Sequence, residues 1–422
     1  MRRRRTVGLC LAYWTAILSG GCHPQPHSVA TTPPPAPLLV VVSLDGFRWD
    51  YPELHGAPNL LALAGDGVRA VSLVPQFPSK TYPNHYSIVT GLRPEHHGIV
   101  ANTMQDPLFG ARFSLADRAA VEDGRWWEGE PIWVTAERAG LRTASSFWPG
   151  SEAEIAGVRP SLWKRYDDSA ADEARADEAL SWLDLPAAKR PRLLLFYLAE
   201  PDRSGHRFGP QSGEAAAAVH HADAIVGRLR AGVEARGLGP STDWIVVSDH
   251  GMAAVDPDRT IVLEEWIDLA EVEVIDLNIV GALRPRAGTE DDLVRRLSRA
   301  DPHLHAARRE DLPARFHYRD HRRIPPVAVW VDPGWTLVAS RDERDRRRGN
   351  PQLGAHGYDP AEPAMHGIFV AAGPFFRSGV ELPSVENVDL YDLFCSILAL
   401  SPASNDGDPR HRLARAVRRS SR

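Results

Sequence analysis

The sequence predicts a doubly wound α/β fold, in which a mostly parallel β-sheet is covered by helices on both faces. Four short apolar runs have the composition of strands buried on both sides, and they lie at residues 38–44, 193–198, 244–247 and 368–372. Amphipathic stretches separate these runs. In one of them a single helical stripe contains Val219, Ala222, Val226 and Leu229. Strands that alternate with helices are typical of parallel sheets.

The first 37 residues predict an export signal followed by a tether. Residues 1–21 contain a basic start, an apolar run of twelve residues and small residues before Cys22, which is the layout of a bacterial export signal. Cys22 resembles the acylated cysteine of bacterial lipoproteins, and simple cleavage into the periplasm is the alternative. Residues 22–37 are rich in proline and predict a stiff, extended tether. We therefore expect an exported, periplasmic protein, either free or tethered to the membrane through a lipidated Cys22.

The remaining sequence predicts one large domain with an insertion. Residues 38–405 contain the strand and helix pattern, which is interrupted at about residues 262–345. We expect an inserted α+β subdomain there, with strands at 271–276 and 327–331 and a helix at 290–299. The charged residues 341–348 predict a solvated loop, and residues 406–422 predict a basic, frayed tail.

The charge balance excludes one class of function. The net charge is −6, and removal of residues 1–21, which carry four arginines and no acid, shifts it to about −10. A protein this acidic is a poor candidate for coating nucleic acid.

Side chains that bind metals stand beside the ends of the four predicted strands. Asp45 follows the first strand, Asp202 and His206 follow the second, the pair Asp249 and His250 follows the third, and His366 precedes the fourth. In open α/β sheets, ligands bind beyond the carboxyl ends of the strands. Three carboxylates and three imidazoles supply two sites of about three ligands each and suit Zn²⁺ or Mn²⁺ rather than calcium. For any one of these residues alone, a helix cap or a packed histidine is the alternative.

Thr81 is the candidate nucleophile. Pro83 suits the first turn of a helix that residues 86–92 continue, so Thr81 is expected at the helix N-terminus. Free N–H groups and the helix dipole favour an anion there. An ordinary N-cap is the alternative role for this residue.

Taken together, these motifs resemble the nucleotide pyrophosphatase/phosphodiesterase family of the alkaline phosphatase superfamily, in a bacterial single-domain form. The resemblance covers residues 38–402. It rests on five motifs in the family's order: SLDGFRWDY (43–51), FPSKTYPNHYSIVTGLRPEHHGIVANTM (77–104), AEPDRSGH (199–206), VSDHGM (247–252) and MHGIFVAAGP (365–374). One departure is Ala199, where the family often has an acid.

The resemblance implies an alkaline phosphatase-like fold and assigns a role to each residue. Thr81 would attack phosphorus and form a phospho-threonine intermediate, and Asn102 would donate to a non-bridging phosphate oxygen. Two divalent ions, expected to be Zn²⁺, would be held by two sets of ligands. The first set is Asp45, Thr81, Asp249 and His250; the second is Asp202, His206 and His366.

The expected substrates are phosphate diesters and pyrophosphates, with nucleotides favoured and nucleoside monophosphates as products. Tyr82 and Tyr166 would stack on a nucleobase, although both can equally be ordinary wall residues. Lipid-headgroup diesters are the alternative substrates. A phosphomonoesterase is the alternative activity, and Lys80 could then supply the extra cationic group. A surface binding protein that has lost activity is the alternative outside enzymes.

Overall fold

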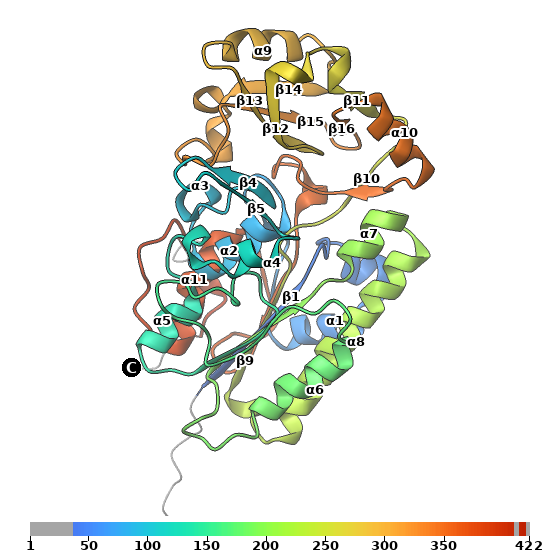
Figure 1. The fold of residues 1–422 in the computed structure, drawn as a ribbon. Coiled ribbons are helices and arrows are strands. Elements are labelled where there is room, and N and C mark those ends of the chain that lie inside the picture. Colours follow the sequence, from blue (N-terminus) through green and yellow to red (C-terminus); the bar gives the residue numbers. More distant parts are fainter. Residues whose placement is uncertain (1–36, 409–412, 419–422) are drawn as a thin grey trace, which may run out of the picture. The chain divides into compact units, whose positions relative to one another are not determined.

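A computed structural model describes residues 37–408 and 413–418 of the chain (Figure 1). The predicted export signal, Cys22 and all of the tether except Pro37 lie outside the described residues. Within the described part, no helix has the length and apolarity needed to cross a bilayer.

The centre of the fold is an eight-stranded, mostly parallel sheet, as predicted. All four predicted strands begin and end within two residues of the expected positions, and β1 and β8 match them fully. The antiparallel member is β18, which pairs with β9 and β2. The strand order is β19 (Val380–Leu382), β2 (Val68–Ala70), β18 (Phe369–Ala372), β9 (Thr242–Val247), β1 (Leu38–Leu44), β8 (Leu193–Leu198), β6 (Thr143–Ser146) and β7 (Leu162–Lys164).

Helices cover both faces of this sheet because alternate side chains of each strand point to opposite faces. Along β1, Leu39 and Val41 belong to one hydrophobic cluster, whereas Val40 and Val42 belong to the other. The first cluster includes residues of α2 (Thr81–Thr90), α5 (Ile132–Arg138) and α11 (Leu390–Leu398). The second includes residues of α1 (Pro58–Asp66), α6 (Asp172–Trp182) and α8 (Gly213–Ala235), among them the predicted stripe of α8.

The predicted insertion forms a small α+β unit with its own hydrophobic cluster. Its antiparallel sheet has the order β12 (Val272–Asp276), β13 (Val280–Pro285), β15 (Val327–Val331) and β14 (Leu304–Arg308), and α9 (Glu290–Leu297) packs against β14. Two strand pairs connect the unit to the rest of the chain. They are β11 (Thr260–Val262) with β16 (Thr336–Val338), and β10 (Ala253–Ala254) with β17 (Gly354–Ala355).

Two segments that were expected to be irregular are ordered. The predicted solvated loop is helix α10 (Arg341–Gly349), because the Ser340 hydroxyl accepts from the Glu343 N–H and the Glu343 carboxylate accepts from the Ala339 N–H. This S-x-x-E pattern is that of a capping box and can be read from the sequence. Part of the predicted frayed tail is also packed, since Leu413 and Ala416 are buried.

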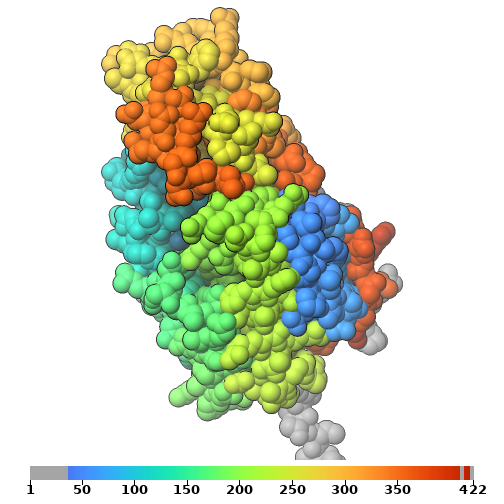
Figure 2. All heavy atoms as spheres, turned by 90° about the vertical axis from the view of Figure 1, so that its right-hand side faces the viewer, coloured from blue at the N-terminus to red at the C-terminus, as the bar shows by residue number. Residues whose placement is uncertain are grey.

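The segment that follows α10 returns to the main sheet beside α7 (Asp202–Phe208). Residues 340–355 (orange) lie next to α7 (green) in both views (Figures 1 and 2), and β17 contacts α7 directly. The Leu353 N–H donates to the His206 carbonyl at 2.9 Å. This return brings the loop after β17 to the same edge of the sheet as the residues that follow β1, β8 and β9.

Candidate active site

Three neighbouring strands deliver carboxylates to one edge of the sheet. Strands β8, β1 and β9 are parallel neighbours, so their carboxyl ends meet there. Asp45 follows β1, Asp202 begins α7 after β8, and Asp249 lies two residues after β9. Gly46 permits the close approach of the first two segments. It has φ +67°, and a Cβ atom at this position would lie 2.9 Å from the Cα atom of Asp202.

The side chains at this edge form one continuous cluster of carboxylates and imidazoles, which we call the Asp–His cluster. Three overlapping groups, each with ligand atoms within 4.8 Å of one another, make up the cluster. They are Asp202, His206 and His356; Asp45, Asp202 and His250; and Asp45, His85 and Asp249. Five of the six predicted aspartates and histidines are therefore brought together, and two histidines that were not predicted as ligands join them.

Three histidines of the cluster are oriented in the same way. His206 Nδ1 lies 2.8 Å from the Gly354 carbonyl oxygen, His250 Nδ1 lies 2.9 Å from that of Gly251, and His356 Nδ1 lies 2.8 Å from that of Ser79. Each contact fixes Nδ1 as the N–H donor, which leaves the Nε2 lone pair directed into the cluster. Metal-binding histidines are held in this way by their other ring nitrogen.

Three carboxylate oxygens of the cluster are buried without a hydrogen-bond partner among the described residues. They are Asp45 Oδ1, Asp202 Oδ1 and Asp249 Oδ2. Burial, reinforced by the Asp249 and Asp202 carboxylates, raises the pKa of Asp45 well above its usual range. Burial and the neighbouring His250 and His206 rings lower the pKa of His356, so its imidazole is neutral. Carboxylate oxygens that lack a hydrogen-bond donor, grouped with imidazole nitrogens, are the donor set of a two-metal site, because bound cations would compensate the carboxylate charge.

His366, which was expected to be a metal ligand, is not brought to the Asp–His cluster by this structure. His366 lies outside the cluster, with Nδ1 2.8 Å from the Ser72 hydroxyl and Nε2 2.9 Å from the Pro360 carbonyl oxygen. Both ring nitrogens are therefore engaged elsewhere. Its place is taken by His356, which lies in the loop after β17 and has its Nε2 atom 3.6 Å from Asp202 Oδ1.

Thr81 lies at the edge of the Asp–His cluster, at the start of α2. It is the first residue of the helix, as the sequence predicted, and its Oγ1 atom lies 3.3 Å from His250 Nε2. His85, one turn later, contacts the Thr81 carbonyl oxygen through Nδ1 at 2.9 Å and the Ser43 hydroxyl through Nε2 at 2.8 Å. The hydroxyl thus faces the cluster from a helix N-terminus, where an anion is stabilised.

Asn102 is tied to the same helix N-terminus. Its side-chain carbonyl accepts a hydrogen bond of 3.0 Å from the Tyr82 N–H, so its amide group is held close to the nucleophile candidate.

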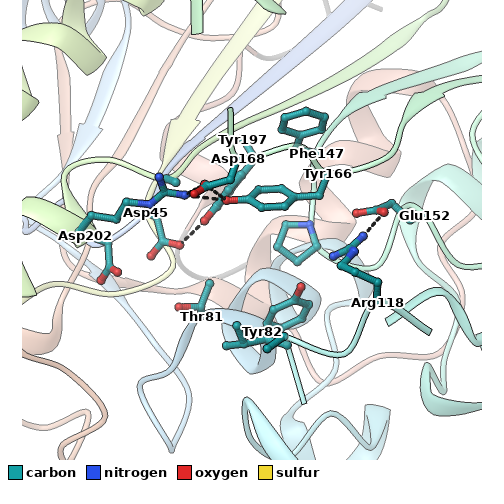
Figure 3. Close-up of a pocket in the computed structure, with 15 residues that line it drawn as sticks. Asp45, Thr81, Tyr82, Arg118, Phe147, Glu152, Tyr166, Asp168, Tyr197 and Asp202 are labelled. Carbon is teal, nitrogen blue, oxygen red and sulfur yellow. Dashed lines mark hydrogen bonds and ion pairs between the residues drawn. The ribbon is translucent and has the colours of Figure 1, made fainter. Parts of the chain in front are cut away.

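One side of Thr81 opens into a cavity of about 510 Å³, which we call the aromatic cavity (Figure 3). Asp45, Thr81 and Asp202 lie at one end, Tyr82 and Tyr166 line the middle, and a charged pair lies at the other end (Figure 3). The lining also includes Leu115, Ala116, Arg118, Phe147, Pro149, Glu152, Asp168, Tyr197, Ala199 and Arg203.

The two predicted tyrosines of the aromatic cavity are held by their neighbours. Tyr82 packs edge-on against Phe113, with ring centroids 5.9 Å apart. The Tyr166 hydroxyl donates to Asp168 at 2.8 Å and accepts from Arg203 at 2.7 Å. Burial and the bond to Asp168 raise the pKa of Tyr166 to about 12, so the hydroxyl stays protonated.

The far end of the aromatic cavity contains an ion pair that the sequence did not predict. Arg118 Nη2 donates to the Glu152 carboxylate, whose side chain is 5% exposed. Arg118 lies thirty-seven residues after Thr81 and belongs to α4 (Arg118–Glu122). No local motif surrounds either partner, and only the fold brings them to the wall of the cavity.

The other side of the Asp–His cluster opens into a second cavity of about 480 Å³, which we call the polar cavity. Its lining is almost entirely polar: Lys80, Asn102, His206, Asp276, Leu277, Asn278, Arg347, Asn350, Gln352 and His356. Lys80 therefore lines the polar cavity and not the aromatic one, and the inserted subdomain and α10 supply four of the ten lining residues.

Known proteins match this fold and this sequence over most of the chain's length. Residues 39–359 match the family model of type I phosphodiesterase/nucleotide pyrophosphatase. An uncharacterised pyrophosphatase/phosphodiesterase of Schizosaccharomyces pombe is 38% identical over 380 residues, which cover 87% of this chain and 78% of that protein. Human ectonucleotide pyrophosphatase/phosphodiesterase family member 1 is 38% identical over 396 residues, which cover 91% of this chain and 42% of the human protein. The chain thus spans less than half the length of the human relative.

The solved structure of murine ectonucleotide pyrophosphatase/phosphodiesterase 5, in an inactive threonine-to-alanine variant in complex with AMP, superposes with a TM-score of 0.83. It is 34% identical in sequence, and the match covers 88% of this chain and 97% of that one. The chain is therefore an enzyme of the type I phosphodiesterase/nucleotide pyrophosphatase family.

Proposed function

We propose that this protein hydrolyses nucleotide phosphodiesters and pyrophosphates and releases nucleoside monophosphates, with two zinc ions held by the Asp–His cluster. One observation carries the proposal. A helix N-terminus places a threonine hydroxyl against a cluster of buried carboxylates and oriented imidazoles, which borders an aromatic and a polar cavity.

The chain's own residues define the covalent steps. The Thr81 oxygen attacks phosphorus and loses its proton, a phospho-threonine forms, and the bond to the leaving-group oxygen breaks. Water then attacks the same phosphorus, which restores the Thr81 hydroxyl and releases the nucleoside monophosphate. Asn102 donates a hydrogen bond to a non-bridging oxygen in both steps.

The proposed metal ligands differ from the sequence-based set in one member. Asp45, Thr81, Asp249 and His250 would hold one ion, and Asp202, His206 and His356 would hold the other. The carboxylate and imidazole donors suit Zn²⁺. When bound, the two ions would stabilise negative charge on the phosphate oxygens and favour deprotonation of the nucleophile.

The aromatic cavity supports a nucleotide as the substrate. Its volume of about 510 Å³ and its two tyrosines suit a nucleoside, and stacking on aromatic side chains contributes about 1–3 kcal/mol per base. At the end farthest from Thr81, Arg118 and Glu152 offer a donor and an acceptor to the edge of a base. A structural relative that contains AMP is consistent with this interpretation.

Comparison of three chromogenic substrates tests the proposal. We expect the highest kcat/KM on p-nitrophenyl thymidine monophosphate, a lower value on bis-p-nitrophenyl phosphate and the lowest on p-nitrophenyl phosphate. EDTA should inactivate the enzyme, and zinc should restore it. Preference for p-nitrophenyl phosphate would instead identify a phosphomonoesterase. Equal kcat/KM values on p-nitrophenyl thymidine monophosphate and bis-p-nitrophenyl phosphate would contradict a preference for nucleotides.

We also propose that the chain is exported to a bacterial periplasm and tethered there through a lipidated Cys22. The basic, apolar and small-residue segments of residues 1–21 support export. Metabolic labelling with a radioactive fatty acid tests the tether, because a Cys22→Ser variant should lose both the label and membrane fractionation. A labelled Cys22→Ser variant, or an unlabelled wild-type protein, would contradict it.

A further inference from the structure

We infer that Asp276 of the inserted subdomain is a positioning residue, which holds the Lys80 ammonium group in place in the polar cavity, beside the Asp–His cluster. The inference rests on the proposed function of Thr81 and gives the insertion a role in that reaction. It follows from an ion pair that joins two segments 196 residues apart.

The Lys80 side chain is fixed at both ends. Its backbone carbonyl accepts from the Asn84 N–H at 3.2 Å and from Asn84 Nδ2 at 2.9 Å, which ties it to the first turn of α2. Its Nζ atom lies 2.6 Å from Asp276 Oδ2. The side chains of Lys80 and Asp276 are only 9% and 19% exposed, so little solvent screens the pair. The flexible four-carbon stem is thereby held in one position at the wall of the polar cavity.

A β-bulge directs Asp276 towards this position. The pairing of β12 with β13 shifts register between Val274 and Asp276, where the β12 strand contains one extra residue. Bulges re-aim the side chain that follows them. The second carboxylate oxygen of Asp276 accepts from the Leu277 N–H at 3.0 Å, which fixes the rotation of the carboxylate.

The same strand also braces the segment that follows Asn102. That segment is a hairpin of β4 (Thr103–Asp106) and β5 (Ala111–Ser114), and Arg112 on β5 donates to the Ile275 carbonyl at 2.7 Å. Strand β12 therefore contacts both the residue before Thr81 and the hairpin after Asn102. The insertion acts on the two segments that carry the proposed nucleophile and phosphate donor.

The ion pair places a compensated positive charge in the polar cavity, which Lys80 and Asp276 line together with Asn102, His206 and His356. A charge held in advance stabilises a developing negative charge without reorganisation at the moment of reaction. Without the Asp276 carboxylate, the ammonium group would be largely buried and unpaired, and it would move towards solvent or towards the carboxylates of the cluster.

A set of variants of the zinc-loaded enzyme tests this inference. We expect Asp276→Asn to lower kcat on p-nitrophenyl thymidine monophosphate about tenfold, with little change in KM, because the loss lies in the transition state. Lys80→Met should have a similar effect. The double variant should be no slower than Lys80→Met alone, because both changes remove the same interaction. Asp276→Glu should recover part of the rate.

Glu273→Gln is the matched control, since Glu273 lies on the same strand and its carboxylate accepts hydrogen bonds from Gln105 and Arg284. This exposed contact also joins β12 to the β4–β5 hairpin but does not reach Lys80. We expect its kcat to equal that of the wild-type enzyme. A tenfold loss in Glu273→Gln, or losses that multiply in the Lys80 and Asp276 double variant, would overturn the inference.

A second measurement separates this inference from the proposed function. Reductive methylation of the substrate-free enzyme, followed by mass spectrometry of the peptide that contains Lys80, measures how well the ion pair protects the amine. Labelling should be slow in the wild-type protein and in Glu273→Gln, and several-fold faster in Asp276→Asn. Slow labelling in Asp276→Asn would overturn the positioning role, even if the enzyme hydrolyses diesters. If Asp276→Asn is labelled fast but the wild-type enzyme hydrolyses no diester, the ion pair is upheld and the proposed function is rejected.

Discussion

The two cavities that border the Asp–His cluster differ in chemistry. The aromatic cavity is walled by tyrosine, phenylalanine, proline and leucine side chains, with its charged pair at the far end. The polar cavity is walled by amides, imidazoles, a lysine and an arginine, with one carboxylate. The first suits a flat ring by stacking, whereas the second suits an oxygen-rich or anionic group by hydrogen bonding.

This difference follows from where the two walls come from. The main domain supplies every residue of the aromatic cavity. The insertion, α10 and the segment after α10 instead supply six residues of the polar cavity: Asp276, Leu277, Asn278, Arg347, Asn350 and Gln352. The proposed reaction needs both sides, because the retained nucleoside and the leaving group lie on different sides of the phosphorus atom. Recognition of the two halves of a substrate can therefore be altered separately.

The largest expected effect removes the Thr81 hydroxyl, which lies at the Asp–His cluster end of the aromatic cavity. Thr81→Ala should lower kcat by at least about 10⁴-fold, because it deletes the proposed nucleophile. The remaining ligands should still bind zinc, measured by elemental analysis of the purified variant. Thr81→Ser is the control and should keep measurable turnover, since it retains the hydroxyl. Substantial turnover by Thr81→Ala would reject the covalent mechanism.

The second-largest effect is expected at His356, which lines the polar cavity, and not at His366, which the sequence indicated. His356→Ala should reduce bound zinc from about two ions to about one per chain and lower kcat by about 10³-fold. His366→Ala should retain both ions, because its ring contacts Ser72 and Pro360 instead of the cluster. Loss of zinc in His366→Ala with retention in His356→Ala would restore the sequence-based assignment.

The choice between these two histidines shows how far the sequence predicts the site. Strand ends are visible in a sequence, and so the positions of Asp45, Asp202 and Asp249 were predictable from the parallel sheet alone. His366 precedes β18, which is antiparallel, and the start of such a strand lies at the same edge. The sequence does not reveal the direction in which the ring points. His356 lies in a loop whose position depends on the return of the chain after α10.

In the fold, too, features with a local sequence pattern were predicted, and contacts between distant segments were not. Apolar runs and helical stripes predicted the central strands, α8 and the insertion, because local patterns record burial. Helix α10 was missed because its charged sequence hides the capping pattern of Ser340 and Glu343. The pair Arg118 and Glu152 and the pair Lys80 and Asp276 are contacts between distant segments, which no local pattern encodes.

A variant of Asn102 tests whether substrates of every kind place their phosphate at the same position between the two cavities. Asn102→Ala should lower kcat by about 10²–10³-fold for diesters of every kind, as for removal of one donor to a developing oxyanion. Its effect should not depend on the leaving group or on the nucleoside, because the residue is proposed to contact only the phosphate. Steady-state kinetics on two unrelated diesters measures this, and a loss confined to nucleotide substrates would place Asn102 at the nucleoside instead.

The smallest expected effects separate the two cavities directly. Tyr166→Ala should raise KM about tenfold for p-nitrophenyl thymidine monophosphate and leave bis-p-nitrophenyl phosphate unchanged, because stacking contributes about 1–3 kcal/mol per base. Tyr166→Phe should behave like the wild type if the ring alone matters. Arg347→Met, in the polar cavity, should instead raise KM a few-fold for ATP, whose leaving group is anionic, and spare the nitrophenyl ester. If Tyr166→Ala and Arg347→Met had equal effects on p-nitrophenyl thymidine monophosphate and on ATP, the two cavities would not divide the substrate between them.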